Sequence, residues 1–229
     1  MLKKYLMFAG LIGGMVISSY AKAFGDLEWQ PRVGLQYQYS NYSAKAAFSN
    51  FIPKKYNHIG IMAGVKISNI LGFDFEYMYS AEKKKNAVLL ANSTFLGAAV
   101  GAADVNYINK VKMNYVGIDM NVYVPFNDNL SLIIAPGVVI GTPNYTMTAA
   151  TASNLATAVY QLEGKMKTIP RVSVGFEYIE EDVGVKILMK WINSSKAKMG
   201  GINTDILNAE AERTFKDAMA MGFSVYVRV

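Results

Sequence analysis

Residues 219–229, Met-Ala-Met-Gly-Phe-Ser-Val-Tyr-Val-Arg-Val, alternate between two kinds of side chain. One face of the implied strand is apolar throughout: Met221, Phe223, Val225, Val227 and Val229. The other face is small or polar: Gly222, Ser224, Tyr226 and Arg228. A strand at the end of a chain still needs a neighbour for its backbone groups. An apolar face opposite a polar one suits a closed barrel with lipid outside and polar groups inside.

The same alternation recurs in seven earlier segments, and no charged residue falls on the assigned apolar faces. The segments are 32–42, 58–68, 73–82, 112–124, 130–141, 170–178 and 183–192. Short connections (68–72, 125–129 and 179–182) alternate with long ones (43–57, 83–111, 142–169 and 193–215). The pattern predicts an all-β, monomeric, eight-stranded antiparallel up-and-down transmembrane barrel, with short periplasmic turns and long extracellular loops.

The N-terminus predicts export. Residues 1–23 combine a basic start at Lys3 and Lys4, a short apolar stretch and an Ala21-Lys22-Ala23 cleavage site, so we expect a signal peptide over 1–23 and an outer-membrane barrel domain over 24–229. Removal of the signal peptide lowers the formal net charge from +6 to about +3, because it takes away three lysines. The basic balance is therefore no argument for a nucleic-acid partner. The chain has no Cys, so packing and backbone pairing alone must hold it.

The faces predicted to point inward carry a set of charges. The bases are Arg32, Lys66, Arg171, Lys186, Lys190 and Arg228, and the acids are Asp74, Glu76, Asp119 and Glu177. Eight strands enclose a lumen that side chains can fill, which favours an internal salt-bridge network over a charged conduction path. Inward glycines are expected to make room for the long side chains opposite them.

The sequence offers little for catalysis. We interpret the single histidine, His58, as a rim residue facing water, because no Ser lies two positions away on its own strand. Asp74 and Glu76 are interpreted as salt-bridge acids, and no cluster has the spacing of metal ligands. We therefore expect no enzyme and no cofactor. Pro136 lies within a predicted strand of a closed sheet and cannot donate to its ladder, which predicts a bulge there.

Aromatic residues mark both predicted membrane interfaces. The loop end has Tyr37, Tyr39, Tyr77, Tyr79 and Trp191, and the turn end has Phe73, Phe126 and Tyr178. Tyr and Trp favour this zone because the ring is apolar while its polar tip stays hydrated.

The long loops are the candidate partner-binding elements, because apolar stretches in exposed segments often mark contacts. The residues singled out are Lys54, Lys55, Lys83, Lys84, Lys85, Leu89, Phe95, Leu96, Tyr160 and Leu207. The loops either bind a host or extracellular-matrix protein or pack on one another as a cap, and 206–213 is predicted to be a short helix. The lysines either meet lipopolysaccharide phosphates or acidic host glycans, or form a solvated rim.

Four stretches resemble the small eight-stranded outer-membrane barrels, the family that includes the opacity proteins and the transmembrane domain of OmpA. They are GIDMNVY at 117–123, PGVVIG at 136–141, VGFEY at 174–178 and GFSVYVRV at 222–229. Family members usually end on Phe, which the barrel-assembly machinery reads, whereas this chain ends on Val229. The resemblance implies a surface protein that acts through its loops, as an adhesin or surface antigen, and contact with outer-membrane lipid. A small porin and a ligand-free structural barrel remain the alternatives.

Overall fold

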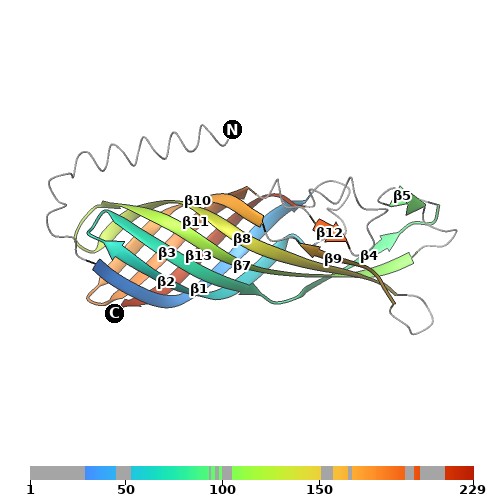
Figure 1. Cartoon of the computed structure of the whole chain (residues 1–229), viewed down its shortest axis with the longest axis horizontal. Coiled ribbons are helices and arrows are strands. Elements are labelled where there is room, and N and C mark those ends of the chain that lie inside the picture. Colours follow the sequence, from blue (N-terminus) through green and yellow to red (C-terminus); the bar gives the residue numbers. More distant parts are fainter. Residues whose placement is uncertain are drawn as a thin grey trace.

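The computed structural model describes residues 29–44, 53–92, 94–95, 98–99, 105–150, 157–164, 167–193, 199–201 and 215–229. These residues form strands, which are numbered along the chain (Figure 1). The strands are β1 (Trp29–Ala44), β2 (Lys55–Ile67), β3 (Leu71–Ser80), β4 (Lys83–Leu89), β5 (Thr94–Phe95), β6 (Ala98–Ala99), β7 (Val105–Pro125), β8 (Leu130–Ala150), β9 (Thr157–Gly164), β10 (Lys167–Glu180), β11 (Val183–Asn193), β12 (Met199–Gly201) and β13 (Phe215–Arg228).

Eight of these strands close into a barrel, as the sequence predicts. The order around the barrel is β1-β2-β3-β7-β8-β10-β11-β13, and every neighbouring pair is antiparallel. The C-terminal strand closes the ring on the first one, in a register that runs from Arg32 opposite Arg228 to Tyr42 opposite Ala218. Closure leaves the barrel wall without an open edge, which a membrane-spanning sheet requires.

The short connections lie together at the end of the barrel where β1 begins and β13 ends (Figure 1). The amide of Val229 donates to the carbonyl of Pro31 at 3.0 Å, which ties the last residue to the first strand. Asn127 shapes one turn, because its side-chain oxygen accepts from the amides of Asn129 and Leu130 at 2.9 and 2.7 Å. In an outer-membrane barrel this is the periplasmic end, and the opposite end is extracellular.

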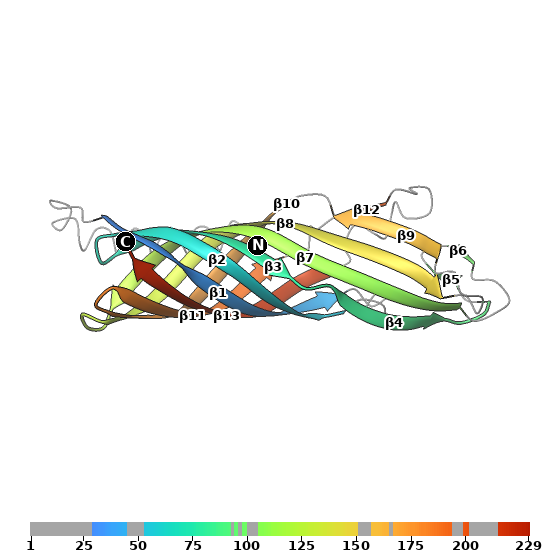
Figure 2. The same ribbon diagram turned by 90° about the horizontal axis from the view of Figure 1, so that it is seen from below.

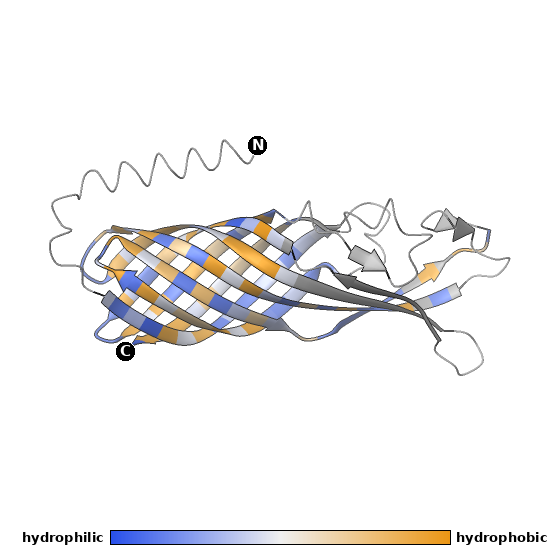
Figure 3. Cartoon of the chain, in the orientation of Figure 1, coloured by the Kyte–Doolittle hydropathy of each residue, from blue (hydrophilic) through white to orange (hydrophobic). Residues whose placement is uncertain are grey.

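The outer surface of the barrel is an apolar belt. Burial alternates residue by residue along the barrel strands, and apolar and polar positions alternate with it (Figure 3). Leu35 and Ile59 are 68% and 67% exposed, although they lie in the middle of a regular sheet. The aromatic residues predicted at the two interfaces are all exposed on this surface. Apolar side chains turned outward around buried charges are the inverse of a water-soluble fold. The chain is an eight-stranded transmembrane β-barrel of the outer-membrane type.

The second and third long connections contain much β-sheet, which the sequence pattern does not predict. β7 and β8 stay paired beyond the barrel as far as Asn106 opposite Ala150, β4 pairs with β7, and β9 pairs with β8. β12 adds to β9. We call this extension the projecting sheet: β4, 105–113 of β7, 142–150 of β8, β9 and β12. Figure 2 shows it continuing one side of the barrel wall.

The bulge predicted at Pro136 is also wrong. The register between β8 and β10 runs without a shift through Val172 opposite Pro136, and the register between β7 and β8 is the same on both sides of the proline. Two rungs are missing from the β7–β8 ladder in this described stretch, Met120 with Pro136 and Asn121 with Ala135. Proline has no N–H to donate towards Met120, so the ladder loses a local bond but gains no extra residue.

Two predictions fall on parts of the chain that lie outside the described residues: the signal peptide at 1–23 and the helix at 206–213. A search of the described residues finds no helix long and apolar enough to span a bilayer.

Candidate functional site

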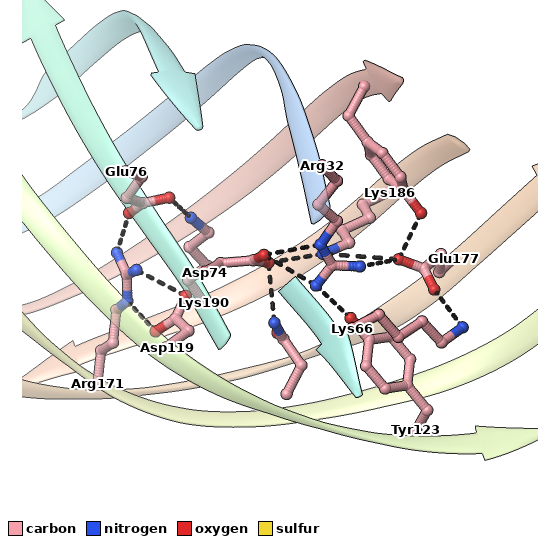
Figure 4. A network of polar contacts seen from close by, with 12 residues as sticks. Arg32, Lys66, Asp74, Glu76, Asp119, Tyr123, Arg171, Glu177, Lys186 and Lys190 are labelled. Carbon is pink, nitrogen blue, oxygen red and sulfur yellow. Dashed lines mark hydrogen bonds and ion pairs between the residues drawn. The ribbon is translucent and has the colours of Figure 1, made fainter. Parts of the chain in front are cut away.

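The lumen near the periplasmic end holds a five-residue ionic cluster centred on Asp74 and Glu177 (Figure 4). Asp74 accepts from Arg32 Nε at 3.0 Å, from Lys186 at 2.6 Å and from Asn121 at 2.8 Å. Glu177 accepts from Arg32 at 2.9 Å, from Lys66 at 3.1 Å and from the hydroxyl of Tyr226 at 2.7 Å. Residues on strands distant in sequence thus meet at one level of the barrel.

This cluster has three bases and two acids, and aromatic rings accommodate the additional positive charge. The Lys66 nitrogen lies 4.3 Å from the centre of the Tyr123 ring, and the Arg32 guanidinium lies 5.3 Å from that of Tyr226. Arg32 also donates to the Tyr123 hydroxyl. Ring faces carry negative charge density and attract cations most strongly where water is excluded.

A second cluster lies nearer the extracellular end and is balanced, with two bases and two acids. Arg171 donates to both carboxylate oxygens of Asp119, from Nε at 2.7 Å and from Nη2 at 2.6 Å, and it also donates to Glu76. Lys190 donates to Glu76 at 2.8 Å. All four side chains are almost fully buried. The bidentate geometry fixes the guanidinium plane as well as its charge.

Nine of the ten predicted lumen charges therefore meet in two clusters, and Arg228 does not. Its guanidinium lies at the periplasmic rim, 4.0 Å from Asp182 and 3.4 Å from the side-chain oxygen of Gln30. Tyr123, Tyr226 and Asn121 also belong to the network, but their contacts with the buried charges are not predicted from the sequence. The alternation along each strand shows that these side chains point inward, whereas their partners depend on the register between strands.

Glycines make the space for these side chains, as predicted. A Cβ on Gly184 would overlap the ring of Tyr226, and one on Gly137 would overlap the carboxylate of Asp119. On Gly117 it would overlap Arg171. Large and small residues thus alternate across neighbouring strands, which lets eight strands enclose nine buried charges.

The prediction that His58 faces water is wrong. Its side chain is fully buried in the lumen, and its ring packs on that of Tyr115 at 5.4 Å between centroids. Around it runs a chain of hydrogen bonds in which Tyr115 donates to Gln38 at 2.7 Å and Gln38 donates to Ser40 at 2.7 Å. This polar layer lies next to the Arg171 cluster and further closes the lumen.

A serine on the neighbouring strand β1 lies close to His58, although no serine lies two positions away from it on β2. The Ser40 hydroxyl lies 3.5 Å from His58 Nδ1, a long contact for a nucleophile and its base. Both side chains have no exposed surface, so a substrate has no access to them in this conformation. Among the described residues no group of His, Cys, Asp and Glu could hold a metal ion. The absence of enzymatic activity stays a prediction.

The candidate partner-binding residues lie at the extracellular end where they are described. Lys54, Lys55 and Lys84 are exposed, and Lys83 and Lys85 are half-buried on β4. For Leu89, Phe95 and Tyr160 the structure describes the backbone only, in β4, β5 and β9. Leu96 and Leu207 lie outside the described residues. The described members are therefore part of β-structure or border it, and no single loop gathers them.

Comparison with known proteins yields likeness of fold only. No protein-family profile and no curated protein matches the chain. Among solved structures, neisserial surface protein A aligns at a TM-score of 0.49 and 11% identity, over 87% of this chain and 97% of that one. The attachment invasion locus protein Ail of Yersinia pestis aligns at 0.44 and 8%, over 89% and 99%. The outer-membrane protease OmpT of Escherichia coli aligns at 0.46 and 7%, over 90% and 97%. These similarities give no information about activity.

Proposed function

We propose that this barrel is a surface protein of the adhesin type, which binds a host or extracellular-matrix protein through its projecting sheet. The observation that carries the proposal is the extra β-structure at the extracellular end. Closing the barrel requires only one short turn from β3 to β7 and another from β8 to β10. Instead, β7 and β8 continue for nine residues each beyond the barrel, about 30 Å along the strand. Ordered surface that the membrane fold does not need is available for recognition.

The composition of the sheet supports a protein partner. In the strand order of the described residues β4 follows β7 at one end of the sheet, outside the barrel wall. Val88 on β4 and Leu90 just after it are 52% and 64% exposed. Exposed apolar side chains on a sheet that lies outside the membrane favour association with another polypeptide.

The filled lumen argues against the alternative of a channel. Asp74, Glu76, Asp119 and Glu177 each have a basic partner within hydrogen-bonding distance, and the polar layer around His58 lies over them. Moving an ion through this network would require several buried pairs to open together, which is costly in a low-dielectric interior. We expect little or no steady conductance in planar bilayers.

The register allows β4, β9 and nearly all of the projecting parts of β7 and β8 to be removed without touching the barrel. Gly141 on β8 is opposite Lys167 on β10, so a two-residue turn can replace 142–166. Tyr79 on β3 is opposite Asn114 on β7, so a similar turn can replace 81–112. All eight barrel strands and both charge clusters remain in such a shaved barrel.

The test compares cells that display the full barrel with cells that display each shaved form, measuring attachment to cultured host cells and to immobilised matrix proteins. Heat-modifiable migration on gels verifies that every form is folded. We expect attachment with the full barrel and its loss in at least one shaved form. Equal attachment by the full and doubly shaved barrels would refute the proposal, and a large ion-selective conductance would favour a channel.

A further inference from the structure

Three lysines form a column on the outer face at the base of the projecting sheet. Lys84 on β4 is directly opposite Lys110 on β7, and cross-strand partners in an antiparallel pair point to the same face. Lys112 is the next residue of β7 on that face, and Lys110 and Lys112 are half-buried where Lys84 is exposed. Lys84 is a candidate residue from the sequence, whereas Lys110 and Lys112 are not, because only the strand pairing brings the three together.

The column stands directly above the extracellular aromatic belt. Tyr79 is paired with Asn114, which follows Lys112 by two residues as β7 runs from the projecting sheet into the membrane. Two residues span about 7 Å along a strand, or about 5 Å along the membrane normal at the usual barrel tilt. The headgroup zone is about 5–7 Å deep on each side of a bilayer. Lys112 therefore lies within that zone, and the backbone of Lys110 and Lys84, about 10 Å above Tyr79, lies a few Å beyond it.

The side-chain contacts hold the base of the column at the interface. The Lys112 nitrogen lies 4.6 Å from the centre of the Tyr79 ring, which is itself 44% exposed on the lipid side. This arrangement keeps a positive charge at the depth where the aromatic belt meets the headgroups.

The column is short of negative charge. Lys84 and Lys110 are like charges in directly opposite positions, an arrangement that destabilises a strand pair. Among the described residues the acid that reaches the column is Glu82, 3.9 Å from Lys110, and both side chains of this pair are partly exposed to solvent. A surface pair of that kind contributes little, so an external anion would relieve the repulsion.

We propose that Lys84, Lys110 and Lys112 bind the phosphate groups of a phosphorylated glycolipid in the outer leaflet. The depth of the column selects a lipid headgroup over a soluble polyanion, because Lys112 is turned towards the Tyr79 ring and the bilayer rather than towards bulk water. The contact anchors the base of the projecting sheet to the membrane surface. This site is separate from the protein-binding surface proposed above and does not depend on it.

The experiment measures binding of diphosphorylated lipid A to the purified barrel in detergent by native mass spectrometry, with dephosphorylated lipid A as the first control. The double variant K110Q/K112Q is compared with K54Q/K55Q, which removes the same charge from the same end of the barrel but on and beside β2. A lysine near an anionic surface is worth about fivefold in affinity, so K110Q/K112Q should bind about 10- to 30-fold more weakly. K54Q/K55Q should change affinity by less than about threefold, and K110R/K112R should retain binding.

Three outcomes would overturn the site. An equal loss of lipid A affinity in K110Q/K112Q and K54Q/K55Q would mean that the overall positive charge of the rim, and not this column, attracts the lipid. Undiminished binding of dephosphorylated lipid A would mean that the phosphate groups are not recognised. Binding of soluble heparin through Lys110 and Lys112, as tight as that of lipid A, would assign the column to an acidic glycan. All variants change exposed or half-exposed positions, and heat-modifiable migration verifies their folding before affinities are compared.

Discussion

Replacing Arg171 by Met would test how the lumen clusters stabilise the barrel. The guanidinium makes three charge-assisted hydrogen bonds in a fully buried position, two to Asp119 and one to Glu76. Breaking a buried ion pair from one side costs about 3–5 kcal/mol, because the remaining charge loses its partner. We expect R171M to lower the free energy of unfolding by about that amount.

The structure also predicts which second change rescues the variant. Without Arg171, Glu76 keeps Lys190 at 2.8 Å, whereas Asp119 loses both of its charged hydrogen bonds. Adding D119N should therefore recover about 2 kcal/mol or more, because it removes the unpaired charge. Adding E76Q should recover nothing, because it takes the carboxylate away from Lys190 instead.

The assay is equilibrium urea unfolding of the barrel in lipid vesicles, followed by tryptophan fluorescence. The chain has two tryptophans, and Trp191 lies on the lipid-facing surface, where its emission reports insertion. A cost below about 1 kcal/mol for R171M would mean that the cluster is hydrated or loosely paired. Equal effects of D119N and E76Q in the R171M background would refute the assignment of partners.

Three further predictions test the outer face, the packing of glycine and the orientation. Ile187→Arg places a charge in the apolar belt and should lower stability by about 2–4 kcal/mol in urea titrations if it lies at the midplane. Gly175→Ala should impair folding, because its Cβ would overlap the backbone carbonyl of Ile187, while Gly222→Ala should be tolerated, because its nearest neighbour is the flexible Lys190 side chain 3.2 Å away; similar urea midpoints would contradict this. The chain lacks Cys, so Val88→Cys should react with a membrane-impermeant maleimide on intact cells and Asp128→Cys only after permeabilisation, and the reverse labelling would invert the topology.

The period-2 pattern was sufficient to predict the barrel wall. Alternation along single segments indicates where each strand lies, which of its side chains point inward and how many strands there are. That signal is local to each segment. The chain-end strand 219–229 pairs with β1 and β11 as a closing strand must. The same rule places nine of the ten inward charges inside the barrel, whereas Arg228 lies at the periplasmic rim beside Asp182.

The rim features escaped prediction for physical reasons. The position of His58 near a predicted strand end indicates exposure to water, but the barrel wall continues around it and Tyr115 packs against its ring. The segments 83–111 and 142–169 lack a clear lipid-facing pattern, because strands outside the bilayer need no apolar face. Their pairing is decided by backbone hydrogen bonds between β4, β7, β8 and β9, which the periodicity of the side chains does not predict.

By itself, the sequence determined that a closed, eight-stranded, lipid-facing barrel with a charged interior would form, because alternation along each strand carries that information. The tertiary structure decided which charges pair, since Arg171 meets Asp119 and Glu76 only once the register of β3, β7, β8 and β10 is set. It also decided that Lys84 and Lys110 stand side by side, because that depends on strand pairing. Register is a property of the assembled sheet: it sums many backbone bonds across neighbours, and no single segment specifies it.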